Sequence, residues 1–305
     1  MEEPEIRRIE EYYRQFNMYE PPRRRWIDRI LSGHKPHVNL ILFILTFLTT
    51  FWTGYYHGNK ISSGLWYSIG IMSILLAHEM GHYVMCRKYG IRATLPFFIP
   101  FPPYINPFGT MGAVIRMEGR IPNRRVLFDV GAGGPIAGLI PTLLAIYFGL
   151  QMSEIIPTRE LSEGMFYLGD SLLFKGLTQW VIGPLSQDQD VVLHPLAYAG
   201  WVGLFVTALN LLPIGQLDGG HVLYALFGEK SQYIYPAILG AFAVICIFFY
   251  IGWLLLIILI MWMGFRHPPT LDPFTPLDPV RKYLAIFVFV IFILSFTPVP
   301  FKIIY

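Results

Sequence analysis

Six long apolar runs alternate with polar segments along the chain, and they cover residues 38–56, 64–86, 126–150, 195–212, 233–265 and 283–301. A helix of about 20 apolar residues is long enough to cross a bilayer, so most of these runs predict one membrane span each. The run 233–265 is too long for one span, and Gly252 near its middle predicts a tight hairpin of two short helices. The pattern predicts an all-α polytopic membrane protein with about seven transmembrane helices.

A different pattern fills residues 91–118, which are apolar but rich in proline. The prolines are Pro96, Pro100, Pro102, Pro103 and Pro107, and they prevent a continuous helix. Residues 109–115, with the sequence Gly-Thr-Met-Gly-Ala-Val-Ile, suit a short strand instead. We therefore predict a re-entrant, β-hairpin-like loop at 91–118. A proline-rich loop at the membrane interface is the alternative.

Composition supports the membrane interpretation. Of the 305 residues, 54% are hydrophobic and 14% are charged, whereas about 25% are charged in an average soluble domain. The mean hydropathy of +0.49 excludes a disordered chain and argues strongly against a water-soluble enzyme. A formal net charge of +3 gives no reason to expect a nucleic-acid partner. Two cysteines, Cys86 and Cys246, are too few for a disulfide-rich secreted scaffold.

Basic residues orient the spans. If the N-terminus lies in the cytoplasm, 19 of the 23 lysines and arginines fall in cytoplasmic segments, in agreement with the positive-inside rule. The chain then consists of a cytoplasmic N-terminal arm, 1–37, and a transmembrane domain, 38–301, with an extracytoplasmic cap loop at 151–194. The N-terminus resembles neither a secretory signal peptide nor an Arg/Ser-rich transit peptide, so we expect a prokaryotic plasma membrane.

The second apolar run contains three ionisable residues, His78, Glu79 and His82. Ionisable groups inside a membrane helix are costly to bury, so they are functional candidates. Residues four apart are separated by about 40° around a helix, so both imidazoles can bind one ion from the same face. Glu79 points sideways and can reach a water molecule on that ion. This spacing is the H-E-x-x-H pattern of zinc peptidases, and a hydrogen-bonded histidine pair in the core is the alternative.

A catalytic zinc ion needs at least three protein ligands. Residues 210–221, which close the fourth apolar run, contain Pro213 and several glycines that break the helix. Such irregular backbone is tolerated at membrane depth only inside protein or beside a water-filled cavity. Asp218 lies there, on the same side of the membrane as His78 and His82, and is the natural third ligand. An ordinary exposed turn is the alternative interpretation of this segment.

Two further residues have several interpretations. His221 follows Asp218 closely, and it can hydrogen-bond to a zinc ligand, stabilise an oxyanion or lie at the membrane interface. Asp129 can orient a zinc-binding histidine, cap a helix or pair with Arg124 or Arg125. The other histidines lie in loops or near predicted interfaces, where we expect solvated or interfacial side chains; they are His34, His37, His57, His194 and His267.

The two unusual segments are more specific together than either is alone. His-Glu-Met-Gly-His at 78–82, with N-x-x-P-x-x-x-x-D-G at 210–219, resembles the motifs of the site-2 protease family of intramembrane zinc metalloproteases. Further similarity at 106–115, 133–138 and 275–282 looks like the branch that includes the chloroplast members and their bacterial relatives.

This resemblance implies a zinc-dependent endopeptidase that hydrolyses a peptide bond in or near a transmembrane helix of its substrate, in regulated intramembrane proteolysis. It implies that His78, His82 and Asp218 bind one zinc ion per chain. A zinc-bound water would attack the scissile carbonyl, with Glu79 as the general base. Asn210 would contact the substrate or the tetrahedral intermediate.

The family also contains an element like 91–118 that meets the substrate. We expect its edge strand to pair with an unwound substrate by β-augmentation, through Asn106, Gly109, Gly112 and Val114. The expected partners are therefore a transmembrane substrate protein and the lipid bilayer. Many members carry a PDZ domain or a cystathionine-β-synthase-type domain. We expect neither here, because 151–194 is too short for a PDZ domain and few residues follow the last run.

Two other functions are compatible with parts of this pattern. A prenyl-protein endopeptidase would take its third ligand from a glutamate on a later helix, but the later apolar runs contain none. A non-proteolytic metal-binding membrane protein or transporter would need more than one intramembrane acid along a path, whereas the sequence offers one cluster.

Overall fold

The computed structural model describes residues 36–158, 166–186, 188–264 and 267–303. The predicted N-terminal arm, 1–37, lies almost entirely outside these residues. The helices are α3 (Pro36–Gly58), α4 (Ile61–Lys88), α5 (Arg124–Gln151), α6 (Leu172–Val181), α7 (Pro195–Asn210), α8 (Asp218–Phe227), the 3₁₀ helix η2 (Gly228–Lys230), α9 (Ser231–Phe248), α10 (Trp253–Met263) and α11 (Pro279–Ser295). The strands are β1 (Arg92–Ala93), β2 (Phe97–Pro100), β3 (Thr110–Val114), β4 (Met117–Glu118), β5 (Glu154–Pro157), β6 (Phe166–Leu168), β7 (Gln189–Val192) and β8 (Phe301–Ile303).

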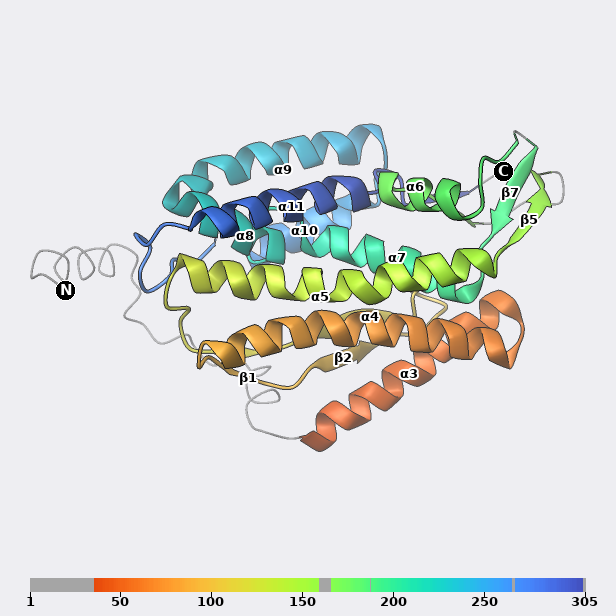
Figure 1. Ribbon diagram of the computed structural model, residues 1–305, viewed down its shortest axis with the longest axis horizontal. Coiled ribbons are helices and arrows are strands. Elements are labelled where there is room, and N and C mark those ends of the chain that lie inside the picture. The colour runs from red at the N-terminus through yellow and green to blue at the C-terminus, as the bar shows by residue number, and fades with distance from the viewer. Residues whose placement is uncertain (1–35, 159–165, 187, 265–266, 304–305) are drawn as a thin grey trace, which may run out of the picture. The chain divides into compact units, whose positions relative to one another are not determined.

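The protein is mainly helical, as predicted (Figure 1). Four segments among the described residues are long and apolar enough to cross a membrane, namely Pro36–Gly58, Ile61–Lys88, Arg124–Gln151 and Asp218–Phe248. The last of these joins α8, η2 and α9. Two shorter apolar helices, α7 and α10, accompany them. These helices are those of a membrane protein, while the total of about seven crossings stays a prediction.

Helices α4, α5 and α7 form the centre of the fold (Figure 1). Helices α5 and α7 approach each other closely because glycines lie at their contacts. A β-carbon at Gly149 would lie 2.2 Å from the backbone nitrogen of Ala197, and one at Gly200 would lie 2.8 Å from that of Ile146. Small residues at such contacts let apolar helices pack by van der Waals contact, which is the main source of helix association in lipid. Trp201 on α7 is buried, and it stacks on Phe205 and packs against Phe301 of β8.

The long apolar run 233–265 forms two helices, α9 and α10, with a break at Phe249–Gly252. The break falls where the sequence predicts it, at Gly252. Both helices expose large apolar side chains along much of their length, as helices that face lipid do.

The last apolar run, 283–301, differs from its prediction. Helix α11 begins earlier, at Pro279, and ends at Ser295. Pro298 and Pro300 follow, and proline cannot continue a helix because it lacks the backbone N–H and its ring clashes with the preceding turn. Beyond these prolines the chain forms β8, which pairs with β6.

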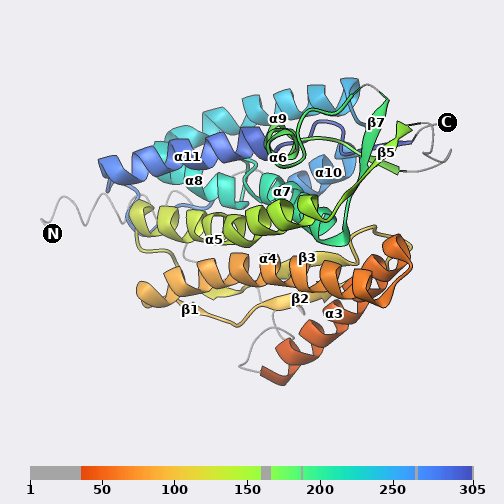
Figure 2. The same ribbon diagram turned by 45° about the vertical axis from the view of Figure 1, so that its right-hand side comes forward.

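The proline-rich segment 91–118 forms an antiparallel hairpin, in which β2 pairs with β3 and β1 pairs with β4. Figure 2 shows the hairpin running alongside α4. The hydroxyl of Tyr67 donates a hydrogen bond of 2.9 Å to the carbonyl oxygen of Phe108 at the tip. Tyr67 is 21 residues before Lys88, where α4 ends and the segment starts, and this corresponds to about 31 Å of helix. The hairpin is therefore observed, while its insertion into a bilayer stays a prediction.

Helices α3 and α7 also hold the hairpin. At the tip, the hydroxyl of Tyr198 donates a hydrogen bond of 3.0 Å to the carbonyl oxygen of Pro107. At the base, Asn39 Nδ2 on α3 donates to the carbonyl oxygens of Leu95 and Pro96, at 3.0 and 2.9 Å. The hairpin is thus anchored at both ends.

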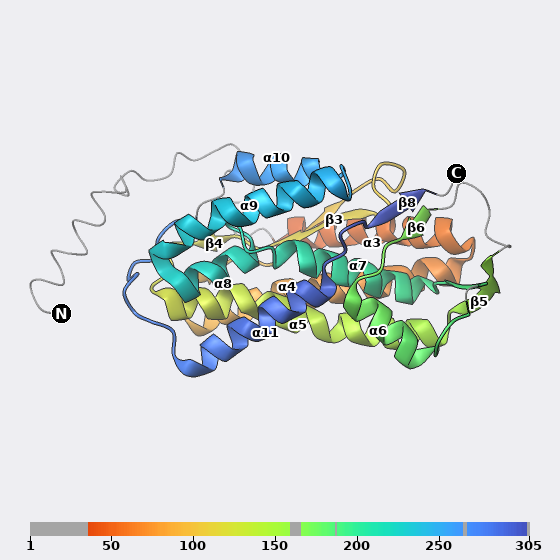
Figure 3. The same ribbon diagram turned by 90° about the horizontal axis from the view of Figure 1, so that it is seen from above.

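The predicted cap loop, 151–194, contains more regular structure than expected. Strand β5 pairs with β7, and β6 pairs with β8 from beyond α11. Figure 3 shows these strands at one end of the helices. Each strand has only three or four residues, and β6 finds its partner far along the chain, so no local alternation could reveal them.

Candidate metal centre

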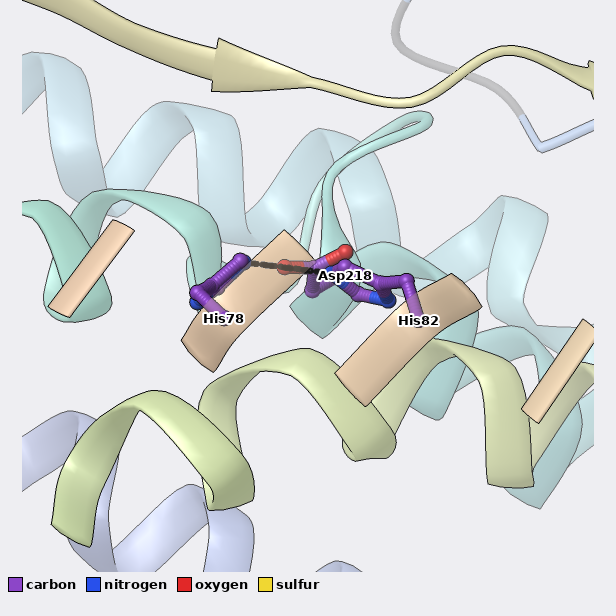
Figure 4. A group of neighbouring side chains, drawn as sticks. All are labelled: His78, His82 and Asp218. Carbon is purple, nitrogen blue, oxygen red and sulfur yellow. Dashed lines mark hydrogen bonds and ion pairs between the residues drawn. The ribbon is translucent and has the colours of Figure 1, made fainter. Parts of the chain in front are cut away.

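The H-E-x-x-H motif lies within α4, where the helix is continuous from Ile61 to Lys88. His78 and His82 therefore point to the same face, and their Nε2 atoms are 3.1 Å apart (Figure 4). Both residues are buried, with exposed fractions of 5% and 7%. Two imidazoles buried in an apolar helix are costly unless a ligand or hydrogen bonds satisfy them.

Asp218 reaches the two histidines from the first residue of α8 (Figure 4). Its Oδ2 atom is 3.2 Å from His78 Nε2 and 3.4 Å from His82 Nε2. The chain between α7 and α8 folds back so tightly that a β-carbon at Gly219 would lie 1.9 Å from the carbonyl oxygen of Leu211. Only glycine fits this buried position, so the D-G-G sequence is required to bring the carboxylate to the histidines.

These three side chains fit a zinc ion. Their ligand atoms all lie within 4.8 Å of one another, and they form the only such group of His, Cys, Asp or Glu found among the described residues. Two imidazoles and one carboxylate match the ligand set of a catalytic zinc site. His82 Nδ1 is 2.7 Å from the carbonyl oxygen of Val130, which can only accept a hydrogen bond. Nδ1 therefore carries the proton, and the Nε2 lone pair of His82 is available to a metal.

Helix α5 makes room for both rings. Gly134 faces His82, and a β-carbon there would lie 2.1 Å from His82 Nε2. Gly138 faces His78, and a β-carbon there would lie 3.0 Å from His78 Cβ. The absence of a side chain at Gly134 in particular leaves room for His82 Nε2, a candidate ligand atom.

The carboxylate of Glu79 lies on the side of α4 that faces the hairpin. It is buried, with 6% exposure, and it accepts a hydrogen bond from the backbone of Ile115, which directly follows β3. The structure therefore places the motif glutamate beside the hairpin strand that the sequence associates with substrate.

The model of one protein family, Peptidase family M50, matches residues 66–254, a range that includes both motifs. The chain belongs to peptidase family M50. This membership confirms the resemblance to the site-2 proteases.

Curated relatives of this M50 chain carry the names of zinc peptidases. "Probable zinc metalloprotease EGY1, chloroplastic" of Oryza sativa subsp. japonica is 32% identical over 176 residues, which cover 57% of this chain and 30% of the relative. "Probable zinc metalloprotease EGY2, chloroplastic" of Oryza sativa subsp. indica is 28% identical over 256 residues, with coverages of 79% and 44%. The chain spans less than half the length of these relatives. Their names support zinc as the metal that His78, His82 and Asp218 can hold.

Asn210, the last residue of α7, also lies beside the candidate metal ligands of this M50 chain. Its Nδ2 atom is 3.3 Å from His78 Nε2. The asparagine of the second motif is thus beside the first motif, 132 residues away in the chain.

The four hairpin residues predicted to meet substrate divide into two groups. Asn106 accepts a hydrogen bond from one backbone N–H of the tip and donates one to a carbonyl of β3, so it shapes the tip. Gly109 has a φ of +71° and packs against α3. Gly112 and Val114 lie in β3, where Val114 is 45% exposed. In this M50 chain the strand residues, rather than the tip residues, are therefore available to a partner.

Asp129 has a partner that the sequence did not reveal. Its carboxylate accepts hydrogen bonds from Arg281 Nε and Nη2, at 2.7 and 2.6 Å, and another from the hydroxyl of Tyr89. It pairs with Arg281 of α11 rather than with a zinc-binding histidine, Arg124 or Arg125. The two residues are 152 positions apart, so no local pattern could identify the pair.

His267, expected from sequence to be a solvated or interfacial histidine, contacts His221 instead. Its Nε2 atom is 2.6 Å from Nδ1 of His221, which lies one turn after Asp218 on α8. The ring of His267 also stacks on that of Tyr224, with centroids 4.6 Å apart. The segment after α10 thus reaches the helix that carries the third candidate ligand.

Proposed function

We propose that this chain is a zinc-dependent intramembrane endopeptidase that hydrolyses a peptide bond in or near a transmembrane helix of a membrane-protein substrate. One observation carries the proposal: His78, His82 and Asp218 converge on helices that are long and apolar enough to cross a membrane. Membership of family M50 supports peptidase chemistry. We assign the reaction to regulated intramembrane proteolysis.

Zinc, when bound, supplies a Lewis acid that polarises the scissile carbonyl and makes a water easier to deprotonate. The chain supplies the proton transfers. We assign Glu79 as the general base, which takes a proton from the attacking water and returns it to the leaving amine. Asn210, 3.3 Å from His78, is placed to donate a hydrogen bond to the scissile carbonyl oxygen as negative charge develops there.

One edge of β3 pairs with no strand among the described residues, and this free edge is the proposed binding site for an unwound substrate segment. Backbone groups of successive residues in an antiparallel strand point alternately to its two edges. The Thr94 N–H donates to the Arg116 carbonyl, so the backbone groups of Arg116 point to the edge that faces the partner strand. The backbone of the preceding residue, Ile115, points to the opposite edge, where it hydrogen-bonds to Glu79. By this alternation Ala113 presents its backbone groups to the free edge, where a substrate strand can pair by β-augmentation.

Ala113→Pro is expected to lower the initial rate of cleavage of a single-span substrate about tenfold, because it removes the backbone N–H that points to the free edge of β3. Val114, the residue named from sequence, directs its N–H to β2, so proline there would break the hairpin itself. Ala113→Ser keeps the N–H and serves as the matched control. The rates are measured in proteoliposomes with both variants shown to be folded, and equal rates for the two would argue against edge pairing.

We place the N-terminus and the metal centre toward the cytoplasm, because this orientation puts 19 of the 23 basic residues on the cytoplasmic side. The lipid bilayer and a transmembrane substrate are then the partners of the protein. The relatives are chloroplastic by name. A prokaryotic plasma membrane for this chain stays a prediction from sequence.

Removal and return of the metal test the proposed function. Proteoliposomes that contain the protein and a reporter with one transmembrane helix should cleave the reporter, stop after treatment with a zinc chelator, and recover with Zn²⁺. Mg²⁺ should not restore cleavage, because it prefers oxygen ligands. Mass spectrometry of the bound metal should follow the activity. Cleavage by zinc-free protein would contradict the proposal, and zinc uptake into vesicles without cleavage would favour a transporter.

A further inference from the structure

Three histidines lie in a row over one face of α5. Each faces a glycine: Gly138 faces His78, Gly134 faces His82, and Gly131 faces His221. These glycines are separated by three and four residues, so they form one stripe along the helix. A β-carbon at Gly131 would lie 2.7 Å from His221 Cβ, which shows how closely the third histidine approaches. Gly131 and Gly134 are about 4.5 Å apart along the helix axis, so His221 continues the row beyond the metal centre.

Hydrogen bonds determine which nitrogen of the outer rings carries a proton. His267 Nδ1 hydrogen-bonds to the carbonyl oxygen of Pro268, which can only accept, so Nδ1 carries the proton. With Nδ1 protonated, the lone pair of the neutral ring is on Nε2. That lone pair accepts the hydrogen bond from His221 Nδ1 at 2.6 Å.

His221 is consequently left with a lone pair on its own Nε2. The candidate zinc ligand His82 has the same arrangement, with its Nδ1 proton donated to the Val130 carbonyl and its Nε2 free to bind a metal. Fixing one imidazole nitrogen by a hydrogen bond while the other ligates is the usual arrangement of metal-binding histidines. His221 is therefore prepared as a metal ligand, although it lies outside the group of three.

Exposure changes along the row. His78 and His82 are buried, whereas His221 and His267 are partly exposed. Stacking on Tyr224 holds the ring of His267 in place. The row therefore runs from a partly exposed histidine pair to the buried metal centre.

A buried metal site needs a path by which the ion arrives. We propose that His221, oriented by His267, is the first protein ligand of an incoming divalent transition-metal ion, which then passes to the group of His78, His82 and Asp218. One water of the hydrated ion leaves when the imidazole binds, and no proton has to be released because Nε2 of His221 already carries a lone pair. This inference rests on the proposed zinc site and adds a loading site to it.

Loading kinetics test the inference without any measurement of proteolysis. Metal-free protein in detergent is mixed with Co²⁺, whose visible absorption reports coordination by protein ligands, and competition with a chelator gives the release rate and the Kd. His221→Asn keeps an N–H for His267 but lacks Nε2. We expect it to slow loading and release about tenfold each, with the Kd unchanged, because a transient ligand affects the path and not the final state.

Variants of His267 separate its orienting role from a general structural one. His267→Gln retains an oxygen that can accept the His221 Nδ1 proton, so loading should stay close to the wild-type rate. His267→Leu has no acceptor, so loading should slow as it does in His221→Asn. His37, an exposed histidine at the start of α3, provides the control His37→Asn, which should load at the wild-type rate.

The outcomes distinguish this inference from the proposed function. Wild-type loading rates in both His221→Asn and His267→Leu would overturn the inference while the zinc site stands. A weaker Kd with unchanged loading would also overturn it, because His221 would then belong to the final site. Equal slowing in His267→Gln and His267→Leu would refute the orienting role of His267. Failure of the wild-type protein to bind Co²⁺ would refute the metal centre itself. Thermal unfolding of the metal-free variants verifies that each is folded.

Discussion

Replacing Glu79 with glutamine is expected to lower cleavage of a single-span reporter by at least about 100-fold while one zinc ion stays bound. Glutamine has the shape of glutamate, and its carbonyl oxygen can still accept the hydrogen bond from Ile115. It cannot take up a proton from water, however, and it leaves the three candidate metal ligands unchanged. Cleavage is measured in proteoliposomes, and the zinc content by mass spectrometry.

The matched control is Glu154→Gln, because Glu154 is an exposed residue of β5. Its cleavage rate and zinc content should equal those of the wild type. Retained cleavage in Glu79→Gln would exclude Glu79 as the general base. Simultaneous loss of zinc and cleavage would show instead that Glu79 supports the metal site.

Replacing Gly134 with alanine is expected to weaken zinc binding about 100-fold and to lower cleavage accordingly. The added β-carbon would lie 2.1 Å from His82 Nε2, so the imidazole has to leave its position over α5. On the proposed zinc site, the displaced atom is the one that would bind the metal. The Kd for zinc is measured by competition with a chelator.

Gly240→Ala on α9 is the matched control, because a β-carbon at Gly240 meets no atom within 4 Å. Both substitutions replace glycine by alanine inside a helix and raise its helix propensity by about 1 kcal/mol, so a general effect on stability is shared. Wild-type zinc affinity in Gly134→Ala would mean that α5 does not determine the position of His82.

The metal centre could be predicted from sequence because its residues break the local rules of a membrane helix. His78, Glu79 and His82 are ionisable groups in an apolar run, and Asp218 lies in a segment where Pro213 and several glycines break the helix at membrane depth. Such departures are visible without knowledge of the fold. The proline-rich hairpin was predictable for the same reason, since five prolines exclude a helix.

The contacts that surround the centre could not be predicted, because they join distant parts of the chain. Asp129 meets Arg281, and His221 meets His267, through folds of the backbone that no periodicity records. The helix that starts at Asp218 was hidden for another reason. Its first residues are Asp-Gly-Gly, which have poor helix propensity and are typical of a turn.

The two parts of the metal centre are 140 residues apart in the chain, since the histidines lie on α4 and the carboxylate begins α8. A ribosome makes α3, α4, the hairpin, α5 and α7 before it reaches Asp218. Until then the nascent chain carries only two of the three ligands that a catalytic zinc site requires. On the proposed function, the protease is therefore inactive until Asp218 has been synthesised, and newly inserted membrane proteins beside it are protected until α8 has docked.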